Sequence, residues 1–452
     1  MPFRSERTLK FFALLLPFSL FICGVCWPLS LRDEKRIGEE LYRKLSKKLH
    51  FVSDPLIGLY VREVGQRIVE ASGDRRFRYR FFVIEGNQPN AFTIPGGYVF
   101  VNTALLNMVS SEDELAGVLA HEVSHSVLRH VSRMFEGARR VSLASLAALV
   151  AGMLLAKEPK AQGAIAAGTA AMAHSLILKY SRDHEFEADQ LSLKILQKAG
   201  YSPQGLVSFL RKIYRWSKTI SVEVPVYLST HPAIPSRIAY LEAHAGSHPP
   251  TETLALKRIK ARLRLMQRDP EEVLRELHRG EDLGVDELYL LALALIRKGN
   301  HREAMEALKK MLVLSPGDPY AQRELALLLI SLKEFDSAEG FLEGALRAFP
   351  RDPELVLAKV NALLFEGKTE EAIAFCRTAV EKVPQEAFLY KVLGELFRKA
   401  GNEVLSHENF GLYFMKEGDR EAALYHFQKA LELSRGEERE RIRRRIEALK
   451  GS

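Results

Sequence analysis

Certain residues recur at intervals of 34 positions in the C-terminal part of this chain. The interval separates three prolines and three alanines, which are Pro316, Pro350 and Pro384, and Ala304, Ala338 and Ala372. A period of 34 residues is typical of a unit of two paired helices, with small residues where the helices touch and proline at the turn between units. Because such units stack on one another to bury their apolar faces, we predict an all-α solenoid here.

The solenoid domain is expected to cover residues 253–452. A stretch rich in turn residues, 246–252, precedes it and is interpreted as the linker between two domains. Residues 418–430 keep the internal spacing of the repeat but are displaced by half a unit, which predicts one additional helix at about 387–400. The concave surface of a solenoid suits peptides or partner proteins, although such an array can also serve only to pack on a neighbouring domain.

The sequence HEVSH, which begins at His121, has the form HExxH and lies in a run with helical character. Ser111 followed by Glu114 is a capping-box start, and apolar residues then recur at helical spacing along one stripe. Because residues four apart share a helix face, the rings of His121 and His125 can bind one zinc ion. Glu122 lies beside them, where a carboxylate can take a proton from water. By chance, the same residues can also occupy a solvated helix face.

A catalytic zinc held by two histidines needs a third protein ligand and an open fourth position. A candidate helix covers residues 181–198, with Glu185 and Asp189 four apart on one face. Glu185 can reach the metal, and Asp189 can accept a hydrogen bond from the outer N–H of a ligating imidazole. An acidic helix start usually only complements the helix dipole, and the spacing does not choose between Glu185 and Glu187.

A small antiparallel sheet is predicted just before the HExxH helix. Residues 78–85 (RYRFFVIE) are β-branched and aromatic, and two further short strands follow after turn clusters. An exposed sheet edge can hold an extended peptide through main-chain hydrogen bonds. Asn90, Ala91 and Phe92 are the candidate edge, and an ordinary hairpin is the alternative interpretation.

The first 30 residues have the layout of a secretory signal. A basic head precedes an apolar run over residues 11–26, which is short for a membrane span and contains Pro17. We expect a cleaved signal at 1–30, with a retained anchor over 11–26 as the alternative.

Two further apolar segments lie within residues 141–178, and each is short for a membrane span. They are interpreted as a buried helical hairpin, a peripheral membrane contact or a membrane re-entry. The net charge of +8 comes from interspersed charges, without a basic stripe that alternates with aromatic residues. This pattern argues against a nucleic-acid partner.

An HExxH helix followed, after an apolar hairpin, by E-x-x-A-D resembles the gluzincin metallopeptidases of the HtpX, BepA-like and CAAX-prenyl-protease family. The resemblance covers about residues 31–245 and includes the block at 90–97 and the segment that begins at Thr230. It implies that Glu185 is the third zinc ligand and that Asp189 corresponds to the aspartate of the motif. The short apolar segments place the chain nearer the periplasmic, BepA-like branch.

The expected fold is therefore α+β. A mostly helical, zincin-type metalloprotease domain with a small antiparallel sheet, at 31–247, precedes an all-α tetratricopeptide-like solenoid. The resemblance implies a secreted or periplasmic zinc endopeptidase that cleaves misfolded or misassembled envelope proteins. The solenoid would dock polypeptide substrates or an outer-membrane assembly machine. The alternative function is a chaperone or adaptor for outer-membrane protein assembly, with latent protease activity.

His231 and Arg237 are additional candidate site residues. Either side chain has the chemistry to stabilise the oxyanion that forms at a peptide carbonyl. A histidine on a loop can instead occupy the open metal position and hold the enzyme off. The structural alternatives are a loop turn before Pro232 for His231 and an ion pair for Arg237.

Overall fold

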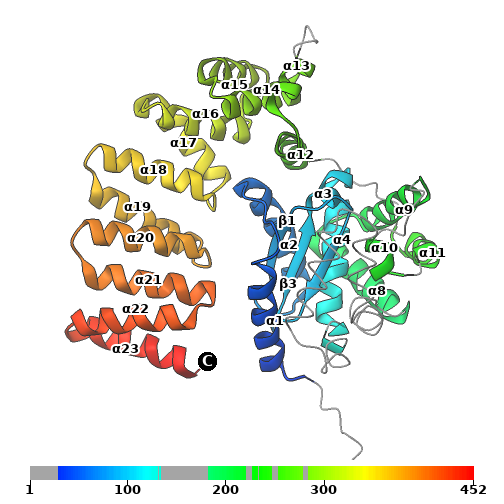
Figure 1. Cartoon of the computed structure of the whole chain (residues 1–452), viewed down its shortest axis with the longest axis horizontal. Helices are drawn as coiled ribbons and strands as arrows, with labels where there is room; N and C mark the ends of the chain where they lie inside the picture. The colour runs from blue at the N-terminus through cyan, green and yellow to red at the C-terminus, as the bar shows by residue number, and fades with distance from the viewer. Residues whose placement is uncertain are drawn as a thin grey trace, which may run out of the picture.

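The computed structural model of the chain describes residues 29–130, 132–133, 182–219, 226–232, 234–246, 253–277 and 283–451. The predicted signal at 1–30, except for its last two residues, and the apolar segments at 141–178 lie outside these residues. Within the described ranges, no helix combines the length and the apolar character needed to cross a membrane. A mostly helical domain with a small sheet and an all-helical domain lie side by side (Figure 1).

The N-terminal domain places its three strands between helices. Its elements are α1 (Leu31–Leu45), α2 (Pro55–Ser72), β1 (Arg80–Ile84), β2 (Ala91–Ile94), β3 (Tyr98–Asn102), α3 (Thr103–Met108), α4 (Glu112–Val127), α8 (Arg182–Ala199), α9 (Gln204–Thr219), α10 (Val226–Thr230) and α11 (Ile234–His244). Successive side chains of a strand point to opposite faces of a sheet. Accordingly, Phe82 stacks on Tyr42 of α1, whereas Phe81 packs closely against Gly65 of α2.

Short polar residues start several helices, as the sequence predicts. Ser30 Oγ accepts a hydrogen bond from Asp33 N at 3.1 Å and caps α1. Ser111 Oγ accepts from Glu114 N at 3.1 Å and caps α4. These bonds satisfy N–H groups that have no partner within the first helical turn.

The prediction of an antiparallel sheet is wrong for one of its two strand pairs. β2 pairs with β3 antiparallel, but β1 pairs with β3 in parallel, so that the strand order is β1-β3-β2. β3 separates β1 from β2 because the chain between them crosses the end of β3 instead of making a hairpin. Asn102 supports this crossing: its Nδ2 donates to Gln88 O at 2.6 Å, and its Oδ1 accepts from Asn90 N at 3.0 Å.

The C-terminal domain is a stack of helices, as predicted from its 34-residue period. Its helices are α12 (Leu254–Gln267), α13 (Pro270–Leu277), α14 (Val285–Lys298), α15 (His301–Leu314), α16 (Pro319–Ser331), α17 (Phe335–Ala348), α18 (Pro353–Phe365), α19 (Thr369–Lys382), α20 (Ala387–Lys399), α21 (Glu403–Glu417), α22 (Arg420–Leu433) and α23 (Gly436–Gly451). The additional helix expected at about 387–400 is α20. Figure 1 shows the stack curving from α12 to α23 beside the N-terminal domain.

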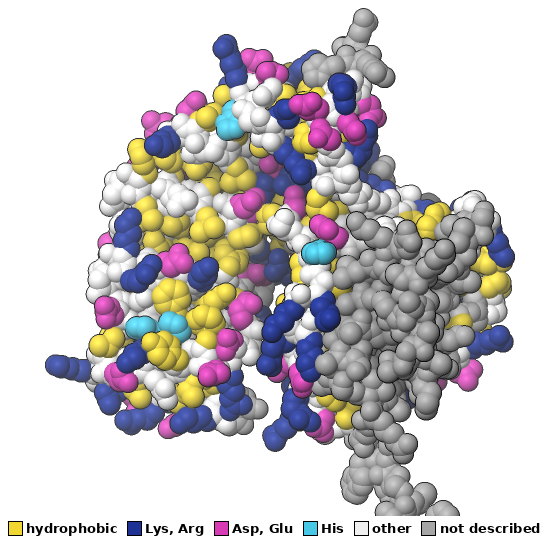
Figure 2. Space-filling model, viewed as in Figure 1, with side chains coloured by type: hydrophobic (Ala, Val, Ile, Leu, Met, Phe, Trp, Pro, Cys, Tyr) yellow, Lys and Arg dark blue, Asp and Glu magenta, His cyan; other side chains and the backbone are white. Residues whose placement is uncertain are grey.

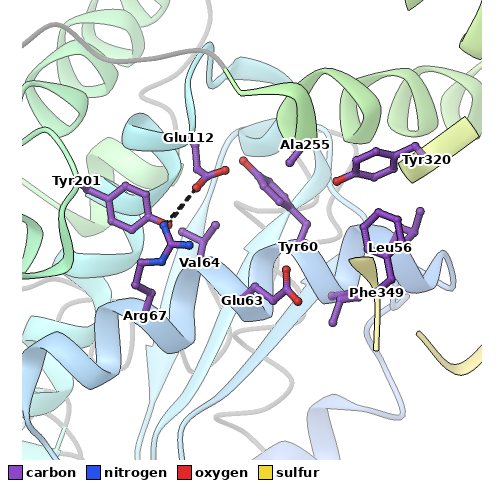
Figure 3. Close-up of a pocket in the computed structure, with 11 residues that line it drawn as sticks. Leu56, Tyr60, Glu63, Val64, Arg67, Glu112, Tyr201, Ala255, Tyr320 and Phe349 are labelled. Atoms are coloured by element: carbon purple, nitrogen blue, oxygen red, sulfur yellow. Dashed lines mark hydrogen bonds and ion pairs between the residues drawn. The ribbon is translucent and has the colours of Figure 1, made fainter. Parts of the chain in front are cut away.

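The first helices of the solenoid pack on the N-terminal domain. Arg262 of α12 donates to Asp54 at 2.7 Å and to Glu324 of α16 at 2.6 Å, which ties the two domains together. A cavity of about 190 Å³ lies at this joint (Figure 3). Rings of Tyr60, Tyr201, Tyr320 and Phe349 and the carboxylates of Glu63 and Glu112 are among the groups that line it.

Candidate metal centre

Helix α4 carries the HExxH residues through the middle of the N-terminal domain. Every residue from 113 to 126 is buried, because α4 packs against α2, α8, α9 and the sheet. The apolar stripe predicted from the sequence is buried, and the remaining faces of the helix are enclosed as well. His121, Glu122 and His125 all have no solvent exposure.

Glu185 of α8 meets the two rings of α4. His121 Nε2 and His125 Nε2 lie 3.0 Å apart, and the Glu185 carboxylate oxygens lie 3.4 Å and 3.3 Å from them. Zinc bonds of about 2.0–2.2 Å in a tetrahedral arrangement place ligand atoms about 3.3–3.5 Å apart. The three side chains therefore fit one zinc ion with little adjustment.

His231 adds a fourth group to this cluster. Its Nδ1 lies 3.4 Å from His121 Nε2 and 3.2 Å from Glu185 Oε1, and its Nε2 lies 3.4 Å from Glu122 Oε1. The ring stacks on Tyr227, which is also fully buried. His121, His125, Glu185 and His231 each offer one ligand atom, and these four atoms lie within 4.8 Å of one another. The four groups together can complete a tetrahedral donor set.

Asp189 and Arg237 surround the metal-facing atoms with a second layer of charge. Asp189 Oδ1 lies 3.0 Å from His121 Nδ1, which leaves His121 Nε2 to face the metal position. Arg237 donates to both oxygens of Asp189, at 2.7 and 2.8 Å, and also to Glu185. The guanidinium is completely buried and directed at carboxylates.

The charges of this cluster shift the pKa values of its members. Burial raises the pKa of Glu185, but the charges of Arg237 and His231 outweigh it and hold that pKa well below its usual value. Burial and Arg237 lower the pKa of His121, yet hydrogen bonds to Asp189 and Glu185 raise it to about 9 in the metal-free chain. Glu185 is therefore ionised, as a metal ligand must be.

Glu122 has a different environment from Glu185. Both of its oxygens are buried, and neither has a hydrogen-bond partner among the described residues. Burial raises the pKa of this carboxyl group. Its Oε1 lies 3.4 Å from His231 Nε2 without a hydrogen bond. A buried carboxylate without hydrogen bonds is unusual in a folded protein and is a candidate for contact with a bound molecule.

His130, which is not among the candidate residues named from the sequence, is a neighbour of the site. Arg129 adopts a φ of 59° just after α4 ends, and this reversal returns His130 toward the helix. His130 Nδ1 lies 3.0 Å from His125 Nδ1, and its Nε2 lies 2.9 Å from Glu187. Its position only five residues after His125 was the available signal, but the left-handed turn was not foreseeable at an arginine.

The candidate substrate edge lies beside α4. Asn90 and Ala91 are buried and Phe92 is half-buried, with its ring stacked on Phe100 at 4.7 Å. β2 contacts α4 and is an edge strand of the described sheet. Asn90 Oδ1 is buried without a hydrogen-bond partner in the described part of the chain.

Comparison with known proteins decides the class of this site. Residues 57–245 match peptidase family M48, and residues 295–355 and 333–396 match the tetratricopeptide repeat. The chain carries an M48 peptidase domain. Zinc is the cofactor of this domain, and the buried group of three or four donors described above is able to hold it.

Relatives of the chain include proteases. The chain is 28% identical over 365 residues to the beta-barrel assembly-enhancing protease of Yersinia pestis, covering 80% of this chain and 69% of the relative. It is 28% identical over 354 residues to the protein of the same name from Escherichia coli K12, covering 76% and 72%.

A mitochondrial metalloendopeptidase, OMA1 of Schizosaccharomyces pombe, is 31% identical over 225 residues, covering 47% of this chain and 61% of the relative. The chain is therefore a metalloendopeptidase with an M48 domain and tetratricopeptide repeats.

Proposed function

We propose that His121 Nε2, His125 Nε2 and Glu185 hold the zinc ion. The observation that carries this assignment is the convergence of these three buried groups at 3.0–3.4 Å. When bound, zinc supplies a Lewis acid that polarises a peptide carbonyl and makes water a stronger nucleophile.

Glu122 is the proton carrier of the proposed reaction. Its carboxylate has no hydrogen-bond partner among the described residues, and burial raises its pKa. A carboxylate beside a reacting water molecule can accept a proton and release it again. Glu122 accepts a proton from the attacking water and passes it to the leaving nitrogen. The peptide bond is thereby hydrolysed without net change in Glu122.

Asp189 and Arg237 position the ligands in this proposal. Asp189 accepts from His121 Nδ1–H and so selects the tautomer that presents Nε2. Arg237 is occupied by Asp189 and Glu185, which supports the ion-pair alternative over a role at the oxyanion. Such a partner keeps Glu185 ionised and fixed in orientation.

We propose that His231 holds the enzyme in an inactive state at rest. Its Nδ1 lies at ligand spacing from His121 and Glu185, which is where the fourth metal position falls. A catalytic zinc needs that position for water or substrate. Release of His231 would then open the site; stabilisation of the oxyanion by its ring is the alternative role.

The edge strand β2 is proposed to hold the substrate. An extended peptide that pairs with the Asn90–Phe92 segment would pass alongside α4, which carries Glu122. The unpartnered Asn90 Oδ1 gives such a peptide a buried acceptor for one main-chain N–H.

The domain boundaries that we propose are 31–247 for the peptidase and 253–452 for the repeats. The two relatives named as beta-barrel assembly-enhancing proteases suggest a role for this chain in the envelope. We propose that it is exported by its N-terminal segment and cleaves misassembled outer-membrane proteins in the periplasm. The repeats would dock these polypeptides or the machinery that assembles them.

The test uses purified chain and a fluorescent unfolded polypeptide such as labelled casein. Hydrolysis by the wild type should fall by at least about a hundredfold in Glu122→Gln, because a proton carrier contributes on that scale. Zinc content, measured by elemental analysis, should remain unchanged in that variant. If wild type and Glu122→Gln hydrolyse casein equally, or complement a gene deletion equally well, the adaptor function is the better account.

A further inference from the structure

A second cavity lies between the two domains, away from the zinc ligands. It has a volume of about 570 Å³. The N-terminal domain contributes residues of α1, α2 and β1, and the solenoid contributes residues between α17 and α22. Figure 2 shows a hollow between the solenoid and the N-terminal domain, with lysine and arginine side chains along it. We call this cavity the interdomain cleft.

The lining of the interdomain cleft carries more positive than negative charge. Its charged side chains are five basic and three acidic, namely Arg62, Arg78, Arg80, Arg351, Lys416, Glu70, Glu386 and Glu417. Arg62 forms an ion pair with Glu386 at 3.1 Å. Among the described residues, the other four basic groups have no carboxylate within ion-pair distance. The cleft is therefore a place where negative charge is favoured.

Three of these cations gather at one end of the cleft. Arg78 donates to two main-chain carbonyl groups of the solenoid, Gln385 O at 2.9 Å and Lys416 O at 3.3 Å. Arg80 lies over the ring of Tyr98. Burial lowers the pKa of Arg78, and the nearby charge of Arg80 lowers it further; burial and the charge of Arg78 likewise lower the pKa of Lys416. Mutual repulsion of this kind is relieved by a bound anion.

The wall of the cleft includes an edge of the sheet. β1 is an edge strand, and residues Arg80, Phe81 and Phe82 line the cleft. Arg80 N donates to Gly97 O at 2.8 Å, toward β3. Main-chain groups alternate in direction along a strand, so those of Phe81 point to the outer edge. Farther along, Val83 O accepts from Val52 N, which closes the outer edge there.

We propose that the interdomain cleft binds an extended, acidic segment of polypeptide, which adds to β1 at Phe81 and places its carboxylates against Arg80 and Lys416. Main-chain pairing supplies affinity for any extended chain, and the cations select acidic side chains. The segment is held on the β1 edge, whereas the substrate edge β2 lies at the other side of the sheet. The inference extends the docking role in the proposed function but does not depend on catalysis.

The binding experiment uses the full chain with the Glu122→Gln substitution, so that no probe is cleaved. Two fluorescent peptides of about eight residues, the length of an ordinary strand, alternate threonine with glutamate or threonine with glutamine. A third peptide has the glutamate sequence with N-methylated main-chain amides. Fluorescence anisotropy gives the dissociation constant of each.

The glutamate peptide should bind about tenfold more tightly than the glutamine peptide. Replacing a neutral hydrogen bond by a charge-assisted one lowers a dissociation constant by about that factor. Combining Arg80→Gln with Lys416→Gln should remove this preference and leave the glutamine peptide unchanged. The side chains of Arg80 and Lys416 take no part in the Arg62–Glu386 ion pair or in the hydrogen bonds of the Arg78 side chain. These contacts between the domains should therefore remain in the variant. The N-methylated peptide should bind at least about tenfold more weakly, because it cannot pair with the strand.

A matched control is the combination of Arg302→Gln and Lys310→Gln on α15, which removes the same charge from exposed positions. It should bind all peptides as the parent does. Equal binding of the glutamate and glutamine peptides, or an equal loss in the control, would overturn the proposal. So would displacement by inorganic phosphate at the concentration of the peptide, which would indicate a simple anion site. These binding results do not depend on whether the wild type hydrolyses casein. The binding proposal and the proposed function can therefore fail independently.

Discussion

At the scale of single residues, the metal centre is a group of buried charges, and each charge is stabilised by a neighbour of opposite sign. Glu185 and Asp189 are fully buried, and Arg237 supplies the positive charge that permits both to remain ionised. Removing one partner of such a group leaves an uncompensated charge and is costly. The cluster is therefore expected to respond sharply to single substitutions.

Replacing Glu185 by glutamine should remove zinc from the protein. The amide is a poor zinc ligand, and the change also leaves Arg237 short of one carboxylate. We expect zinc per chain, measured by elemental analysis after dialysis, to fall by at least about tenfold. Glu187→Gln is the control, because Glu187 lies on the same helix but contacts His130 instead. Loss of zinc in Glu187→Gln alone would contradict the assignment.

Replacing His231 by alanine should raise the rate of casein hydrolysis while zinc content stays constant. The expected rise is at least about fivefold, because the fraction of molecules with an open fourth position increases. The initial rate is to be measured with wild type and variant at equal zinc occupancy. A fall in rate would instead support a role for His231 in stabilising the oxyanion.

At the scale of elements, the position of α4 depends on close helix contacts. A Cβ at Gly117 would come within 2.7 Å of Leu206 N, and one at Gly205 would come within 2.2 Å of Asp113 O. These two glycines let α4 and the start of α9 approach closely. The approach contributes to the enclosure of His121 and Glu122.

Gly117→Ala should therefore destabilise the M48 domain even though alanine favours helices. The methyl group must displace the backbone of α9, at a cost of about 1–3 kcal/mol in the free energy of unfolding. Thermal unfolding followed by circular dichroism measures the change. Gly340→Ala in α17 is the control: its Cβ meets open space, and a gain of about 0.5–1 kcal/mol is expected. Equal changes in both variants would show that the close approach is unimportant.

At the scale of the whole molecule, the joint between domains is built from buried ion pairs. Arg262 is only 10% exposed and links α12 with Asp54 of the N-terminal domain and Glu324 of α16. Arg323 also contacts Glu324, at 2.8 Å. These contacts hold the first repeats against the M48 domain and thereby fix the distance between the two walls of the interdomain cleft.

Arg262→Met should lower the free energy of unfolding by about 2–4 kcal/mol, since it breaks a buried ion pair on one side. Calorimetry should also show the unfolding of the two domains separating into distinct transitions. Arg264→Met, which removes a half-exposed ion pair with Glu276, should cost less than about 1 kcal/mol. A single unchanged transition in Arg262→Met would contradict the role of the joint.

Local sequence features determined the start of α1 and α4, the helical repeats and the motif residues His121, Glu122 and His125. Each depends on neighbours within a few positions or on a fixed period, because capping bonds and helix faces are local properties. The proximity of Glu185 to the two histidines could be proposed because the HExxH and E-x-x-A-D motifs occur together in the family that the chain resembles. The parallel pairing of β1 with β3 has no local signal. The closeness of His130 to His125 in the chain is a local signal, but the left-handed turn at Arg129 that brings the two rings together is not foreseeable.

The amino-acid sequence by itself thus determined the composition of the site and the periodic architecture of the solenoid. Only the tertiary structure decided that α4 is enclosed on all sides, that His231 faces the metal position and that Arg237 is held by two carboxylates. These properties arise where segments separated by about 50 to 110 residues converge. Their contacts depend on how helices pack, and the residues nearby in the chain do not specify that packing.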